Sequence, residues 1–63
     1  MPFAQIHMIE GRSEEQLETV IQKVTDALAE ASGAPKEAIR VVISEVPASH
    51  WGKAGVTAKS LGR

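Results

Sequence analysis

The chain has no cysteine and no tyrosine, and only one phenylalanine and one tryptophan among its 63 residues. Without cysteine it can form neither a disulfide nor a thiolate zinc site. Its two histidines, His7 and His50, are far apart in the sequence and lack the spacing of a helical metal-binding pair. We therefore expect no metal site.

Long hydrophobic runs and clusters of basic residues are also missing. Apolar stretches extend over only a few residues, whereas a membrane-spanning helix needs about 20. The formal net charge of −1, without a basic run, provides no electrostatic footprint for nucleic acid. No signal-peptide pattern opens the chain, because Glu10 and Gly11 interrupt the first apolar stretch. We expect a cytoplasmic protein that binds neither membranes nor nucleic acids.

The chain length limits how much core the protein can build. Sixty-three residues are enough for one domain, residues 1–63. A chain of this size buries only about 60% of the surface that its unfolded form exposes, so its core is marginal. Small domains compensate with disulfides, metals or oligomerisation. Since the composition argues against the first two, we expect an oligomer.

The strongest secondary-structure signal is a helix over residues 14–32. Ser13 and Gln16 form a capping-box pattern, in which each side chain can bond the backbone amide of the other. Gly33 suits the position just after a helix. Apolar residues recur at spacings of three and four, which predicts one buried helix face. They are Leu17, Val20, Ile21, Val24, Ala27, Leu28 and Ala31.

Two predicted strands flank this helix. Residues 3–9 alternate between two faces, and residues 39–45 are rich in β-branched side chains. The order strand, helix, strand predicts a right-handed crossover with parallel strands. The fold class is therefore α/β, a β-α-β protomer, with a short hairpin predicted in the glycine-containing tail, residues 48–63. Such a unit leaves strand edges unpaired, which again indicates an oligomer.

Few residues can carry out chemistry, and Pro2 is the first candidate. If Met1 is removed after translation, the chain begins with a prolyl secondary amine, a basic nitrogen on a rigid ring. With Met1 attached, this nitrogen is an amide and cannot act as a base. Removal of Met1 is therefore a condition of this hypothesis. The structural alternative is that Pro2 merely begins a strand.

Arg12, Arg40 and Trp51 are the other candidates. Guanidinium groups bind carboxylates through two parallel hydrogen bonds, so both arginines are candidate carboxylate ligands. Trp51, the single tryptophan, can form an apolar pocket wall. The structural alternatives are a solvated Arg12, an ion pair between Arg40 and a nearby glutamate, and a core or interface position for Trp51.

Together these residues resemble the 4-oxalocrotonate tautomerase family of the tautomerase superfamily, over essentially the whole chain. A proline, two placed arginines and an aromatic residue are far more specific in combination than any one of them alone. The matching motifs are Pro2-Phe3-Ala4-Gln5-Ile6-His7, Ile9-Glu10-Gly11-Arg12-Ser13, Ile39-Arg40-Val41-Val42-Ile43 and the aromatic residue of His50-Trp51-Gly52.

The resemblance implies an isomerase that converts an enol or dienol 2-oxo acid, such as 2-hydroxymuconate, to its conjugated keto isomer without a metal or organic cofactor. It implies Pro2 as general base and acid, and Arg12 as the ligand of the distal carboxylate. Arg40, from a neighbouring subunit, would bind the reacting end and stabilise charge on the carbonyl oxygen. Trp51, where the family commonly has Phe, and Ile9 complete the implied binding site. The implied assembly is a homohexamer, a trimer of dimers.

The chemistry assigned to Pro2 sets a requirement on its pKa. A group that takes and returns a proton works best with a pKa near the working pH. Apolar surroundings and nearby guanidinium charges disfavour the protonated amine. We therefore expect the pKa of the Pro2 amine to be lowered in the assembled site.

Two other functions stay open from the sequence. A haloacrylate dehalogenase or hydratase of the same superfamily has to activate water, which calls for an additional acid and further arginines. Ile9 closes the first strand where such an arginine would lie, and no acidic side chain follows Glu45. A non-enzymatic oligomeric binding module is the second alternative, and an isomerisation assay distinguishes it.

Overall fold

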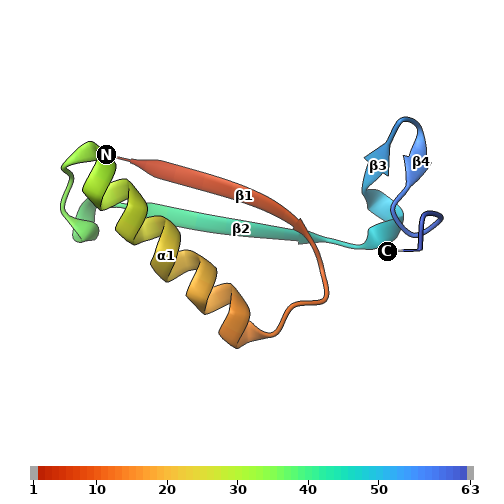
Figure 1. The fold of residues 1–63 in the computed structure, drawn as a ribbon, viewed down its shortest axis with the longest axis horizontal. Helices are drawn as coiled ribbons and strands as arrows, with labels where there is room; N and C mark the ends of the chain where they lie inside the picture. The colour runs from red at the N-terminus through yellow and green to blue at the C-terminus, as the bar shows by residue number, and fades with distance from the viewer. Residues whose placement is uncertain (1, 63) are drawn as a thin grey trace.

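The computed structural model describes residues 2–62 and consists of a β-α-β unit followed by a C-terminal arm (Figure 1). Strand β1 (Phe3–Ile9) leads through a loop into helix α1 (Glu14–Ser32). A 3₁₀ turn, η1 (Lys36–Ala38), connects the helix to strand β2 (Arg40–Val46). The two strands pair in parallel along their whole length. The predicted β-α-β fold with parallel strands is confirmed.

Helix α1 begins and ends where the sequence predicts. The Ser13 hydroxyl accepts a hydrogen bond from the Gln16 amide at 3.1 Å, and the Gln16 side chain accepts one from the Ser13 amide at 3.0 Å. These are the two halves of a capping box. At the other end Gly33 has a φ of 76°, and its amide donates to the Ala29 carbonyl at 3.0 Å. Glycine adopts this left-handed conformation without strain.

Strand β2 begins one residue later than predicted, because Ile39 belongs to the preceding turn. The Ile39 amide donates to the Lys36 carbonyl at 3.0 Å and closes η1. The strand therefore covers Arg40–Val46 in place of residues 39–45. The Ile39 side chain is 6% exposed and contributes to the core. Pro47 follows the strand directly and ends it, as the sequence predicts.

The helix covers one face of the two-stranded sheet and packs mainly on β2 (Figure 1). The side chains of β1 alternate between half-buried and exposed, with Ala4, Ile6 and Met8 on the half-buried side. The other face is open in a single chain, where Phe3 is 63% exposed and Val42 is 42% exposed. One chain therefore leaves half of its sheet surface uncovered.

The C-terminal arm, residues 47–62, projects beyond the end of β2 and away from α1 (Figure 1). It contains a second 3₁₀ turn, η2 (Ala48–His50), and an antiparallel hairpin of β3 (Gly52–Lys53) and β4 (Val56–Thr57). The two residues between these strands both have positive φ, as in the tight turns that fit the twist of a hairpin. The predicted hairpin is therefore confirmed.

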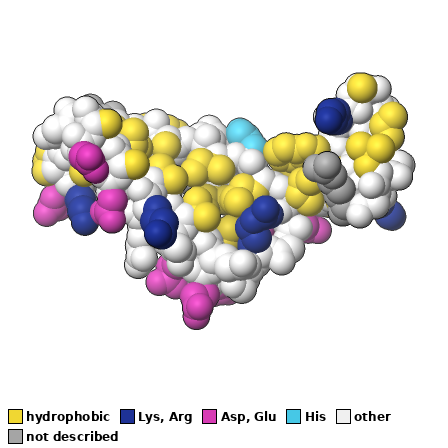
Figure 2. All heavy atoms as spheres, viewed as in Figure 1, with side chains coloured by type: hydrophobic (Ala, Val, Ile, Leu, Met, Phe, Trp, Pro, Cys, Tyr) yellow, Lys and Arg dark blue, Asp and Glu magenta, His cyan; other side chains and the backbone are white. Residues whose placement is uncertain are grey.

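The chain is extended for its size. Its radius of gyration is 14.4 Å and its extents are 42 × 24 × 13 Å, whereas a compact domain of this length has a radius of about 11 Å. Apolar side chains are exposed over the body and on the arm (Figure 2). On the arm, Val56 is 42% exposed and Leu61 is 53% exposed. Within residues 2–62, no helix combines the length and apolar character needed to cross a lipid bilayer.

Candidate active site

Pro2 and Arg40 lie next to each other at the beginning of the two parallel strands. The Arg40 amide donates to the Pro2 carbonyl at 3.1 Å, and Phe3 pairs with Arg40 in the strand register. Pro2 is half-buried, whereas Arg40 is exposed. One chain thus places the candidate base and one candidate carboxylate ligand at the same end of the sheet.

Two backbone carbonyls hold the Arg40 guanidinium beside the η1 turn. Its Nη1 donates to the Glu37 carbonyl at 2.8 Å and to the Ile39 carbonyl at 3.2 Å. Among residues 2–62, neither Nε nor Nη2 of this side chain donates a hydrogen bond, and the ion pair considered for Arg40 does not form. The exposed guanidinium therefore keeps donors accessible to an anionic group.

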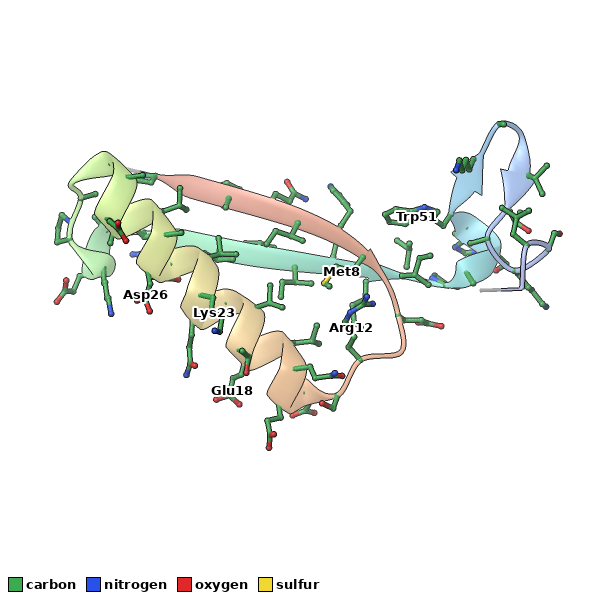
Figure 3. All side chains as sticks on the ribbon, in the orientation of Figure 1. Met8, Arg12, Glu18, Lys23, Asp26 and Trp51 are labelled. Carbon is green, nitrogen blue, oxygen red and sulfur yellow. The ribbon has the colours of Figure 1, made fainter. Side chains whose placement is uncertain are left out.

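The opposite end of β1 carries the other three predicted residues. An open groove of about 250 Å³ is lined by Ile9, Arg12 and Trp51, together with His7 and Met8. The Arg12 Nη1 donates to the Ile9 carbonyl at 3.1 Å, which holds this exposed side chain beside the strand end. Figure 3 shows Arg12 and Met8 near the end of β1, with the Trp51 ring extending toward them. A cation and an apolar wall thus share one groove, as binding of an organic anion requires.

The arm positions Trp51 through its backbone. Pro47 ends β2, and the following η2 turn is closed by the His50 amide, which donates to the Pro47 carbonyl at 2.8 Å. The Trp51 amide then donates to the Ala48 carbonyl at 3.4 Å, and the Trp51 carbonyl accepts from the Ala58 amide at 2.7 Å. The half-buried Trp51 is therefore held at the base of the hairpin, next to the groove.

The two ends of β1 are too far apart for one chain to bring all five predicted residues together. The strand covers the seven residues Phe3–Ile9, and at about 3.3 Å per residue its ends are about 20 Å apart. Pro2 and Arg40 lie at one end, and Ile9, Arg12 and Trp51 lie at the other. A single chain therefore carries two separate halves of the predicted site.

His7 and Met8 also line the groove, although the sequence motifs did not predict them as site residues. Their position next to Ile9 in the sequence could have predicted this, because a groove around the end of a strand is lined by consecutive residues of that strand. Consecutive side chains of a strand point to opposite faces, so these two residues were not expected to line one groove. The groove curves around the strand end, so residues from both faces line it.

Among residues 2–62, the single ion pair lies outside the groove and on the surface. Asp26 raises the pKa of Lys36, through a hydrogen bond and through its charge, and the two side chains are 2.7 Å apart. Both side chains are more than half exposed, and neither lines the groove beside Arg12. In the part of the chain that the structure describes, no three potential metal-ligating side chains come together.

Comparison with known proteins identifies the family. A family model described as tautomerase enzyme matches residues 2–60. The 2-hydroxymuconate tautomerase of Comamonas testosteroni is 65% identical over 63 residues, which is 100% of both chains. A 2-hydroxymuconate tautomerase of Pseudomonas putida is 64% identical, again over 100% of both chains.

Two solved structures superpose on nearly the whole chain. A 4-oxalocrotonate tautomerase isozyme of Methylibium petroleiphilum superposes with a TM-score of 0.95 at 63% identity, covering 98% of this chain and 100% of that one. A heterohexameric 4-oxalocrotonate tautomerase of Chloroflexus aurantiacus gives 0.93 at 36% identity, with 97% and 98% covered. The expectation of an isomerase with tautomerase activity is confirmed. Matched from residue 2 to residue 60, the chain belongs to the tautomerase family of enzymes.

Proposed function

We propose that the mature protein, beginning at Pro2, converts 2-hydroxymuconate to its conjugated 2-oxo-3-enoate isomer. The observation that carries the choice of substrate is the full-length identity of 65% and 64% to two relatives named 2-hydroxymuconate tautomerase. The groove supports it, because Arg12 offers a guanidinium beside the apolar side chains of Ile9 and Trp51. A dicarboxylate with an apolar, conjugated middle matches this combination of groups.

We propose that the working site forms between subunits. The two halves carried by one chain are about 20 Å apart along β1, which is much longer than a six-carbon diacid. A Pro2 end and an Arg12–Trp51 end from different chains can face the same substrate molecule. Each chain places its own Arg40 beside Pro2 through the backbone, but the guanidinium of that Arg40 is held against the η1 turn. We therefore assign the Arg40 that contacts the substrate to a subunit that neighbours the one supplying Pro2.

The same surfaces support a homohexamer, a trimer of dimers. Phe3 and Val42 are exposed on the uncovered sheet face, and Val56 is exposed on the arm. Covering such side chains is worth about 25 cal/mol per Å² of apolar surface removed from water, so association supplies core that one chain lacks. The cytoplasm remains our prediction for its location, and the 2-oxo or enol acid for its small-molecule partner.

In the proposed reaction the Pro2 nitrogen takes the proton of the substrate's 2-hydroxyl group. The conjugated electrons shift along the chain toward C5 as the C2 carbonyl forms. The prolinium then returns the proton to C5, so one proton moves from oxygen to carbon and the enzyme is regenerated. Arg40 stabilises the negative charge on the C2 oxygen, Arg12 binds the distal carboxylate, and Ile9 and Trp51 exclude water.

The test combines intact mass, native mass and an isomerisation assay on the same preparation. Protein that starts at Pro2 is expected to be a hexamer and to isomerise 2-hydroxymuconate. A preparation that keeps Met1 is expected to assemble equally well and to be nearly inactive, because its Pro2 nitrogen is an amide. Full activity with Met1 attached would exclude the Pro2 mechanism. A faster reaction with a haloacrylate than with 2-hydroxymuconate would replace the proposed function with the dehalogenase alternative.

A further inference from the structure

The groove beside Arg12 has a second, smaller cavity behind its wall. This cavity, about 60 Å³, lies under the arm and is lined by Lys53, Ala58 and Leu61. Ile9 and Trp51 line both spaces. Figure 3 shows the Trp51 ring extending from the arm toward the end of β1. The two side chains therefore form a partition between a larger compartment containing Arg12 and a smaller one containing Lys53.

Hydrogen bonds hold the backbone of this partition at Trp51. The Trp51 carbonyl accepts a hydrogen bond from the Ala58 amide at 2.7 Å, and Ala58 is only 3% exposed. Within residues 2–62, the indole Nε1 donates no hydrogen bond, and Trp51 is only half-buried. The position of the wall is thus set by the backbone, while its thickness is set by the size of the side chain at position 51.

The second compartment has the charge to bind an anion. Lys53 lines it, and the single ion pair among the described residues joins Lys36 to Asp26, so Lys53 has no carboxylate partner there. All eight acidic residues of the chain precede the arm. A space of this size holds a few water-sized groups, which is enough for a carboxylate and a short piece of its carbon chain.

We propose that Trp51 sets the length of the diacid that the enzyme accepts, by closing off a second compartment in which Lys53 binds a carboxylate. This role rests on the proposed function, because it concerns the chain length of the diacid that the proposed isomerase binds. With the indole in place, an enol diacid must fit between the reacting end and Arg12. With a small side chain at position 51 the two compartments merge, and a longer diacid reaches Lys53.

Binding of two saturated diacids tests the partition without requiring turnover. Adipate has six carbons and suberate has eight, and calorimetry gives the dissociation constant of each for the assembled mature protein. The wild type is expected to prefer adipate. Trp51→Ala is expected to change the ratio of the two constants by about tenfold in favour of suberate, because suberate has two more methylenes than adipate and each one removed from water contributes a factor of about four. An unchanged ratio would overturn the proposal.

A matched pair of lysine variants tests the role of Lys53. In the Trp51→Ala background, Lys53→Met is expected to remove most of the gain in suberate affinity, about tenfold, because a hydrogen bond to a charged group is lost. Lys59→Met removes the same charge from the same arm, but Lys59 lines neither compartment, so it is expected to leave the gain intact. Equal effects of the two variants would contradict a specific Lys53 site.

Two further readouts keep the test decisive. If native mass shows that Trp51→Ala does not form the wild-type assembly, Trp51→Leu, which keeps an apolar side chain, is measured in its place with the same expected direction. Turnover of 2-hydroxymuconate is followed in parallel. If replacing Trp51 leaves the ratio of the adipate and suberate constants unchanged while the wild type turns over 2-hydroxymuconate, the partition alone is refuted. If the ratio changes as expected but the wild type has no isomerase activity, the proposed function alone is refuted.

Discussion

The β-α-β body and the C-terminal arm of this protein are stabilised in different ways. The body combines a capped helix with a parallel pair of seven-residue strands in continuous register. The arm has a hairpin of two-residue strands and a few turn hydrogen bonds. Yet the arm places Trp51, and the body places Pro2 and Arg40. The less regular region therefore contributes the aromatic wall of the proposed binding groove, while the more regular one carries the proposed proton-transfer group and the rest of the groove lining.

The largest expected effect comes from the body end of the site. Pro2→Ala replaces the rigid secondary amine with a primary amine, and we expect kcat for 2-hydroxymuconate to fall at least about 100-fold, within the range that a general acid–base catalyst contributes. The measurement is steady-state kinetics on protein whose intact mass shows that Met1 is absent. Unchanged turnover, with the native mass also unchanged, would mean that the chemistry does not depend on this end of β1.

Replacing Arg12 tests the end of the site that lies beside the arm. Arg12→Ala is expected to raise KM for the diacid about 10-fold or more with a smaller change in kcat, because a charge-assisted hydrogen bond to the distal carboxylate is lost. The control substrate is a 2-hydroxydienoic monoacid, which has no distal carboxylate and is expected to keep its KM. Equal losses for both substrates would remove Arg12 from the role of distal-carboxylate ligand.

Ser13 distinguishes the two regions by stability. Ser13→Ala removes a capping bond of 3.1 Å to the Gln16 amide, and we expect it to lower the free energy of unfolding by about 1 kcal/mol. Ser49→Ala makes the same chemical change in the arm, where the Ser49 hydroxyl makes no hydrogen bond within the described chain, and is expected to be neutral. Denaturant unfolding at equal protein concentration checks both, since assembly couples stability to concentration. Equal losses of unfolding free energy in the two variants would show that the Ser13 hydroxyl does not stabilise the helix by capping it.

The smallest expected effect concerns the exposed Lys36–Asp26 pair. Asp26 raises the pKa of Lys36 above its ordinary value of 10.5. A raised pKa in the folded state contributes stability below pH 10.5, and this contribution is lost as the pH rises through the raised value. Lys36→Met is therefore expected to make the free energy of unfolding slightly less dependent on pH over that alkaline range. Because the pair is exposed, the difference should also decrease with added salt, and a salt-independent difference would point to another cause.

The body could be predicted from the sequence because its signals are local. The capping box of Ser13 and Gln16, the apolar stripe and Gly33 each act within one helical turn of the residues they affect, and they placed α1 correctly. The start of β2 was placed one residue early, since Ile39 is β-branched and reads as strand. Its amide is already used by the η1 turn, a competition that propensity does not reveal.

The site was harder to predict than the fold, because it depends on distance along a strand. The residues of the proposed site could be named from family motifs, but their positions at opposite ends of β1 follow only from the strand geometry. The shared wall formed by Ile9 and Trp51 depends on the direction that the arm takes after Pro47. No local pattern encodes that direction, so the second compartment had no sequence signal.

The length of β1 also has a consequence for how the enzyme behaves in dilute solution. Since a single chain keeps Pro2 and Arg12 at opposite ends of one strand, an isolated chain has every proposed catalytic group and no complete pocket. The turnover rate per chain then depends on the fraction of chains that are assembled as well as on the catalytic residues. If the site forms between subunits as proposed, we expect this rate to fall steeply once the protein is diluted below the concentration at which its copies separate, although no covalent bond and no side chain has changed.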